Sequence, residues 1–146
     1  MSTESTFDGA SSDRRELLDV SISASAENIA GVADKVAEIL LGSSMPEEKQ
    51  LEIGLALQEA LANAVVHGCG NDPSKKIRCR LNSDSQGRLL IIVSDPGPGM
   101  ETSPSATPTL SPNLYLDHGR GIYLIRQLMD DVRFERGGSE IQMWKY

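Results

Sequence analysis

The order in which the hydrophobic period changes along the chain constrains its fold more than any other feature. Apolar and polar residues alternate over 18–22, as in a half-buried strand, and then recur with helical spacing over 29–40 and again over 53–65. The segments 77–81 and 89–93 return to strand character, and the second of them is apolar throughout. Because strands and helices do not alternate strictly, this order disfavours a Rossmann-type sheet.

The C-terminal part continues the mixed order. A third helical stripe runs from Ile122, and a hairpin closes the chain with strands over 132–136 and 141–145. The predicted fold class is α+β: a two-layer α/β sandwich with helices on one face of a mostly antiparallel, mixed sheet. Residues 89–93, apolar on both sides, are predicted to form a central strand.

The charge of the chain limits its partners. Its 146 residues suffice for about one domain, and 14 Lys and Arg against 21 Asp and Glu give a net charge of −7. This balance argues against a nucleic acid or an anionic membrane, because either needs a concentrated basic face, and the pair Lys75-Lys76 is too short to supply one. No apolar run approaches bilayer length and no secretion signal is evident, so a cytoplasmic protein is expected.

Two stretches have the composition of segments outside a packed core. Residues 1–15 are rich in Ser, Thr, Asp and Gly and lack a period, so we predict a disordered tail before a single domain over 16–146. Residues 100–118 hold three prolines and no Lys or Arg. A loop of that length inside a compact domain is usually functional, and we predict a mobile lid.

Glu59 and Asn63 are spaced to lie on one face of the second helix, away from its apolar stripe. A carboxamide oxygen suits Mg²⁺ that phosphates already partly neutralise, and a carboxylate one turn away suits a general base. His67 continues the same row, either facing a ligand or as an ordinary helix-capping histidine. For the pair alone, a solvated polar helix face is the commoner explanation.

The exit of the apolar strand supplies a second group. Asp95 follows this strand and is itself followed by Gly97 and Gly99. A carboxylate there can accept a hydrogen bond from an exocyclic amine such as adenine N6, and the glycines let the backbone approach a planar base. The alternative is a Gly-Pro turn in which Asp95 is a local acceptor.

A third group, Gly119-Arg120-Gly121, opens the third predicted helix. Backbone N–H groups exposed at a helix start favour phosphate, and the Arg120 guanidinium adds a charged fork. A flexible junction between loop and helix explains the glycines equally simply. Together, the three groups in this order within one small domain predict a nucleotide pocket.

With these motifs in place, the chain resembles the ATP-binding module of the gyrase, histidine-kinase and MutL (GHKL) superfamily, the Bergerat fold. Within it, the chain most resembles the stand-alone anti-sigma factor serine/threonine kinases of bacteria, over roughly residues 18–146. No His-bearing pair of dimerisation helices is evident before the module, and no transducer domain after it. This favours the serine kinases over histidine kinases and over gyrase- or MutL-type enzymes.

The resemblance implies ATP and Mg²⁺ as cofactors, with Glu59 as the catalytic general base and Asn63 as the Mg²⁺ ligand. The residues implied to hold the nucleotide are Asn63, His67, Asp95, Gly97, Gly99, Gly119, Arg120 and Gly121. Among them, Asp95 would read adenine. The family's lid often carries a basic residue near the terminal phosphate; residues 100–118 have none, which leaves Arg120 as its substitute.

The implied function is that of an ATP- and Mg²⁺-dependent protein serine kinase, acting as an anti-sigma factor or partner-switching regulator of transcription. Its substrate would be an anti-anti-sigma protein, with a sigma factor as a further partner and no direct contact with nucleic acid or membrane. A homodimer is a further option. The alternatives are a catalytically weak ATP-binding module that sequesters a partner, and a detached histidine-kinase catalytic domain.

Overall fold

The structure, a computed structural model, describes residues 14–96 and 120–146, with the side chain of Arg120 excepted. The predicted lid and nearly all of the predicted tail lie outside these residues, as do Gly97, Gly99 and Gly119. The first strand begins at Arg15, one residue before the predicted domain boundary.

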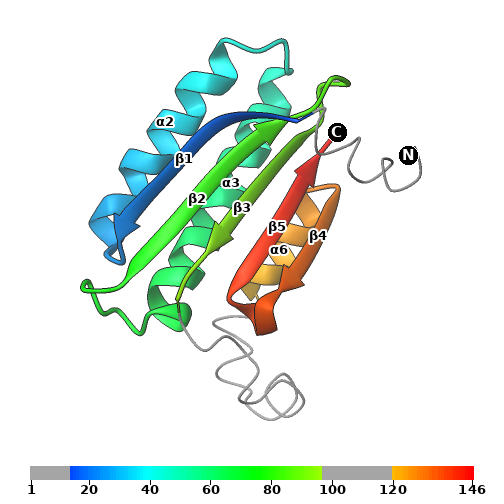
Figure 1. Cartoon of the computed structure of the whole chain (residues 1–146). Coiled ribbons are helices and arrows are strands. Elements are labelled where there is room, and N and C mark those ends of the chain that lie inside the picture. The colour runs from blue at the N-terminus through cyan, green and yellow to red at the C-terminus, as the bar shows by residue number, and fades with distance from the viewer. Residues whose placement is uncertain (1–13, 97–119) are drawn as a thin grey trace, which may run out of the picture.

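Within the described residues, five strands form one sheet in the order β1-β2-β3-β5-β4, and each neighbouring pair is antiparallel (Figure 1). The strands are β1 (Arg15–Ser23), β2 (Lys76–Ser83), β3 (Leu89–Ser94), β4 (Asp131–Glu135) and β5 (Glu140–Lys145). The central position predicted for the apolar strand is confirmed, since β3 is the middle strand and is buried along its whole length.

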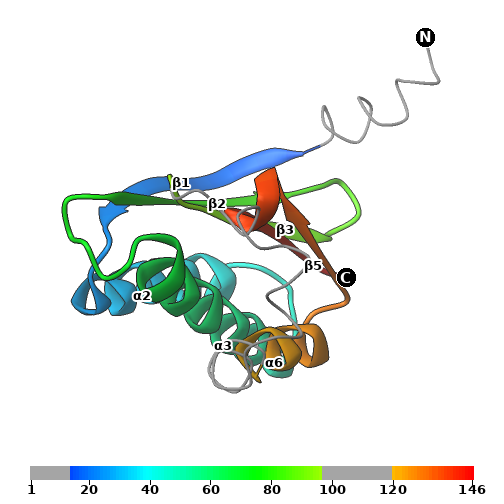
Figure 2. The ribbon, with the colours of Figure 1, turned by 90° about the horizontal axis from the view of Figure 1, so that it is seen from below.

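In the part of the chain that the structure describes, three α-helices form a layer on one face of the sheet (Figure 2). They are α2 (Ile29–Leu41), α3 (Glu47–Asn63) and α6 (Arg120–Leu128), and α3 packs against both of the others. A short 3₁₀ turn, η1 (Ala26–Asn28), precedes α2. The predicted two-layer α+β sandwich is confirmed. None of the described helices is long and apolar enough to cross a membrane.

The last two strands form the predicted hairpin, joined by a 3₁₀ turn, η4 (Arg136–Gly138). The turn runs through left-handed backbone, with φ of 55° at Arg136, 69° at Gly137 and 99° at Gly138. Glycine adopts this conformation without steric cost, which explains the pair of glycines. Arg136 is thereby held at one end of the sheet, beside the end of β3.

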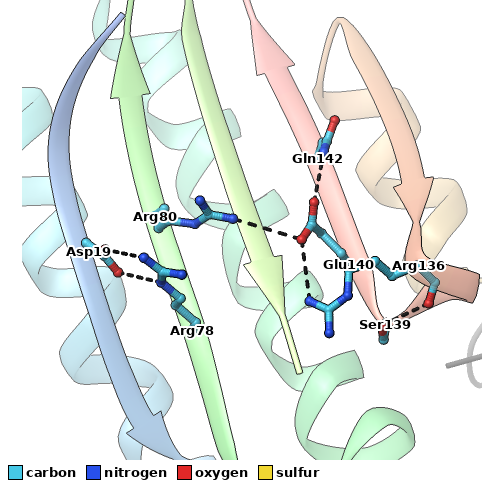
Figure 3. Close-up of polar contacts among 7 residues, drawn as sticks. All are labelled: Asp19, Arg78, Arg80, Arg136, Ser139, Glu140 and Gln142. Carbon is cyan, nitrogen blue, oxygen red and sulfur yellow. Dashed lines mark hydrogen bonds and ion pairs between the residues drawn. The ribbon is translucent and has the colours of Figure 1, made fainter. Parts of the chain in front are cut away.

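Alternation in β2 divides apolar from charged side chains. Ile77, Cys79 and Leu81 are fully buried beneath the helices. Arg78 and Arg80 point to the opposite side, the open face of the sheet, where Arg78 forms a two-pronged ion pair with Asp19 of β1 (Figure 3). The helix side of β2 is thus core, and its open side is a row of cations.

The burial of Cys79 predicts a pH dependence of stability. Burial raises the pKa of its thiol from 9.0 to about 12, and the Asp19 carboxylate adds to the rise. Between these pH values the unfolded chain loses the thiol proton while the folded chain keeps it. The free energy of unfolding should therefore fall as pH rises, by up to about 4 kcal/mol. Urea unfolding of the wild type and Cys79→Val across this range should show a shallower pH dependence for the variant; equal slopes contradict the prediction.

A buried lysine of β5 connects this strand to helices α3 and α6 through an ion pair and a hydrogen bond. Lys145 is 5% exposed; its ammonium group pairs with Glu52 of α3 at 2.7 Å and donates to the Leu128 carbonyl at the end of α6. Glu52 lies in the first half of α3, so the end of α6 meets the beginning of α3. The start of α6 is thereby directed toward the other end of α3, where the candidate site lies.

Candidate functional site

The first part of the site lies where α3 and α6 touch. Glu59 and Asn63, one turn apart on α3, face Gly121 in the first turn of α6. A Cβ atom on Gly121 would lie 3.0 Å from Glu59 Oε1 and 3.5 Å from both Oδ1 and Nδ2 of Asn63. Gly121 is buried, and the two polar side chains are half-buried. The polar face of α3 is therefore covered by the start of another helix rather than simply solvated.

The second part lies where β3 ends. Asp95 is 8% exposed, and its backbone N–H donates to the Ser139 carbonyl at 2.9 Å, which fixes the strand exit beside the start of β5. Its carboxylate lies directly against Gly68, because a Cβ atom on Gly68 would sit 2.2 Å from Asp95 Oδ2. The carboxylate position and a side chain at residue 68 exclude one another.

A π-helical turn, η2 (Ala64–Gly68), carries Gly68 to this contact. It continues α3, and the Cys69 N–H donates to the Ala64 carbonyl five residues earlier, at 2.9 Å. Gly68 is not among the site residues predicted from the sequence, and the sequence pattern did not predict the wide turn. The available signal was a glycine directly after the polar row of α3. Turns of this kind are frequent at functional sites.

The two parts of the candidate site are linked through α3. Asn63 ends α3 and Gly68 ends the turn that follows it, so both contacts lie at the same end of one helix. Asp95 also influences the neighbouring Cys69: burial raises the pKa of this thiol, and the Asp95 carboxylate adds to the rise. Three segments that are distant in the sequence thus bring Glu59, Asn63 and Asp95 to one region.

The remaining predicted residues stay predictions. His67 lies in the π turn and is exposed. Because a π turn holds more residues than an α turn, His67 departs from the straight row that α-helical spacing predicted for it. Arg120 is the first residue of α6, but its side chain is not among those described, and Gly97, Gly99 and Gly119 lie outside the described residues.

The chemistry of the side chains fits a nucleotide with a divalent cation. Asn63 offers a neutral carboxamide oxygen, the kind of ligand that suffices where phosphates supply the charge. Glu59 offers a carboxylate next to it, and Asp95 offers an acceptor held at a fixed position by Gly68. The bare Cα of Gly121 lets α6 begin close to both α3 side chains, at the helix end that favours anions.

Comparisons with known proteins identify the family of this chain. Residues 22–145 match the model of the histidine kinase-like ATPase domain. The chain is 30% identical over 125 residues to the serine-protein kinase RsbW of Bacillus subtilis (strain 168). The aligned region covers 81% of this chain and 73% of that protein. It is 31% identical over 105 residues to the anti-sigma F factor of Clostridium novyi (strain NT), and this alignment covers 67% of this chain and 71% of that protein.

A solved structure agrees on the fold. The structure of the SiaB–SiaC complex from Pseudomonas aeruginosa contains a chain similar to this one, with a TM-score of 0.57 at 13% identity. The match covers 98% of this chain and 95% of that one, and at this identity it speaks for the fold alone. With the family model spanning most of the sequence, the chain belongs to the histidine kinase-like ATPase domain family, as a distant homologue of the RsbW serine kinases and the anti-sigma F factor.

Proposed function

We propose that this protein is an ATP- and Mg²⁺-dependent protein serine kinase that acts as an anti-sigma factor or related partner-switching regulator. The observation that carries the proposal is the contact of Glu59 and Asn63 with Gly121. This contact places a candidate general base, Glu59, and a candidate oxygen ligand for a cation, Asn63, next to the start of helix α6. The similarity to a serine-protein kinase and to an anti-sigma factor supports the same assignment.

Each residue has a distinct task in this proposal. ATP with Mg²⁺ supplies the phosphoryl group and neutralises its charge. Asn63 holds the cation through its carboxamide oxygen, and Asp95 accepts a hydrogen bond from the adenine amine. Glu59 takes the proton of the acceptor serine hydroxyl as the serine oxygen bonds to the terminal phosphorus and the bond from phosphorus to ADP breaks. Catalysis then rests mainly on positioning and charge.

The proposed substrate is an anti-anti-sigma protein that carries the acceptor serine, and a sigma factor is the proposed second partner. The name of one relative, anti-sigma F factor, supports a protein partner of this kind. The SiaB–SiaC complex, which shares the fold, is likewise an assembly of two named proteins. The net charge of −7 agrees with a protein partner in place of a nucleic acid.

A transfer assay tests the proposal. The protein is incubated with Mg²⁺, ATP labelled on the terminal phosphate, and a candidate anti-anti-sigma protein from the same organism. The proposal predicts label on a serine of that protein. Label on a histidine would instead select the detached histidine-kinase domain, and partner binding with no transfer of label would select a sequestering module.

The sequestering module is the second candidate because of one sequence feature. Residues 100–118 contain no Lys or Arg that could stabilise the terminal phosphate during transfer. In this candidate the protein holds ATP at the same residues and binds its partner without chemistry. The transfer assay separates the two candidates directly, since only the kinase moves label to the partner.

The contact between Gly68 and Asp95 gives a testable prediction for nucleotide binding. Gly68→Ala should weaken ATP binding about 10-fold, because the added methyl group takes the position of the Asp95 carboxylate and displaces a hydrogen-bond acceptor. Gly54→Ala, in α3, which the π turn continues, is the matched control: a Cβ atom on Gly54 would have nothing within 4 Å. It should leave ATP binding unchanged and raise the free energy of unfolding by about 0.5–1 kcal/mol.

Titration with a fluorescent ATP analogue, together with urea unfolding, measures both variants. Equal affinities of Gly68→Ala and Gly54→Ala for the analogue would show that the Gly68–Asp95 contact has no part in binding.

A further inference from the structure

A shallow hollow of about 470 Å³ lies at the end of the sheet where β1 and β3 finish and β2 begins. Ser21, Arg78 and Ser94 are partners in the registers of these three strands, so they lie side by side on the open face. Asp95 and Pro96 form part of the lining, which places the hollow next to the candidate site. The Asp95 carboxylate itself is turned to Gly68, on the helix side.

Cations dominate the lining. Lys75, Lys76, Arg78 and Arg136 all line the hollow, and among the described lining residues only Asp95 is acidic. These four are among only 14 Lys and Arg in a chain whose net charge is −7. Figure 3 shows Arg78 and Arg136 on the two sides of the end of β3. The fold therefore gathers, from separate segments, a local positive surface that the overall charge conceals.

Most of these cations lack close acidic partners. Arg78 is paired with Asp19 at 2.6 Å, but Arg136 reaches Glu140 only at 3.7 Å. Neither Lys75 nor Lys76 forms an ion pair with any carboxylate of the described residues. The ammonium groups are therefore available to a partner.

Arg80, one position along the open face of β2, shows the same shortage of acceptors. Its Nη2 atom reaches Glu140 Oε1 at 3.9 Å, the same oxygen that faces Arg136 (Figure 3). Its Nε atom is buried and has no hydrogen-bond partner in the described part of the chain. Arg80 and Arg136 thus share a single carboxylate, that of Glu140, so the described residues neutralise these two cations incompletely.

We propose that the hollow docks an acidic segment of the protein partner, with carboxylates meeting Lys75, Lys76 and Arg136. The hollow is shallow, and its cations stand on both sides of β3, which suits several carboxylates presented along a chain better than one enclosed phosphate ion. Rim charges of this kind act chiefly on encounter rate and partner choice. The inference rests on the proposed function for the existence of a protein substrate, and it adds the chemistry by which that substrate is recognised.

A binding experiment on the full chain tests the inference with defined probes. Fluorescein-labelled peptides of alternating Glu and Gly, and of alternating Gln and Gly, are titrated at low salt and followed by anisotropy. The wild type should bind the Glu peptide at least about 10-fold more tightly than the Gln peptide, with a preference that declines as salt rises. Lys76→Gln should weaken the Glu peptide about 3-fold, and Lys75→Gln/Lys76→Gln about 10-fold or more.

Lys35→Gln is the matched control, because Lys35 is exposed on α2 and also lacks an ion pair among the described residues. It removes the same charge on the helix side of the sheet, opposite the open face, and should change Glu-peptide binding less than about 2-fold. All three variants should retain wild-type ATP affinity. If the wild type did not bind ATP, the proposed function would be refuted rather than the docking inference. Failure of the docking inference and failure of the proposed function are therefore distinguishable.

Three results would overturn the inference. In the first, the Glu and Gln peptides bind equally. In the second, Lys35→Gln weakens the Glu peptide as much as Lys76→Gln, which would indicate general attraction. In the third, inorganic phosphate binds with the same dependence on Lys75 and Lys76 and fully displaces the peptide, which would make the hollow a small-anion site.

Discussion

Glu59→Gln is expected to lower the rate of phosphoryl transfer by about 100- to 10,000-fold, the usual contribution of a general base. Glutamine keeps the size and the polar end of the side chain, so the contact with Gly121 can persist. It loses the capacity to take a proton from the acceptor serine. ATP affinity should therefore stay within about 3-fold of the wild type, because the change acts on the transition state rather than on ground-state binding.

Single-turnover measurements at saturating ATP isolate this effect from binding. Glu38→Gln is the matched control, since Glu38 is an exposed carboxylate on α2 and takes no part in the α3–α6 contact. It should transfer label at the wild-type rate. If Glu59→Gln were as active as Glu38→Gln, Glu59 could not be the base, and the polar face of α3 would serve nucleotide binding alone.

Asp95→Asn is expected to weaken ATP binding about 10- to 100-fold, the range of a lost hydrogen bond to a charged group. The carboxylate only accepts, whereas the amide must present either an NH₂ group or an oxygen to the adenine amine. GTP has a carbonyl oxygen where adenine has the amine, so its affinity should change less. The ratio of ATP affinity to GTP affinity should therefore be lower in Asp95→Asn than in the wild type.

Competition of unlabelled ATP and GTP against a fluorescent ATP analogue gives both affinities for each protein. Asp34→Asn, an exposed aspartate of α2, controls for the loss of one negative charge. An Asp95→Asn protein that keeps the wild-type ratio of ATP to GTP affinity would exclude Asp95 as the residue that reads the base.

Hydrophobic periodicity predicted the two layers because, in this fold, the apolar and polar pattern within each strand or helix determines which of its side chains are buried. Alternation over 77–81 correctly separated the buried Ile77 and Cys79 from the outward Arg78, and the unbroken apolar run of β3 marked the middle strand. These patterns depend only on which side of an element faces the core. The residue types of Glu59, Asn63 and Asp95 likewise pointed to the region that the fold assembles.

Other features depend on contacts that no local pattern encodes. The π turn over 64–68 is a change of hydrogen-bond register within ordinary helix-forming residues, so the contact of Gly68 with Asp95 could not be predicted. The basic hollow arises from the register between β1, β2 and β3. In the sequence, Lys75-Lys76 is only a short pair of cations. In the fold it becomes part of a larger basic surface, because the hairpin turn brings Arg136 to the same end of the sheet.

The most direct test of the whole account is calorimetric titration of the protein with ATP in the presence and absence of Mg²⁺. We predict saturable binding of one ATP per chain that is strengthened by Mg²⁺, and loss of the Mg²⁺ effect in Asn63→Ala, because Asn63 is the assigned ligand of the cation. Absence of ATP binding, or an Asn63→Ala protein with an unchanged Mg²⁺ effect, would contradict the assignment of this site.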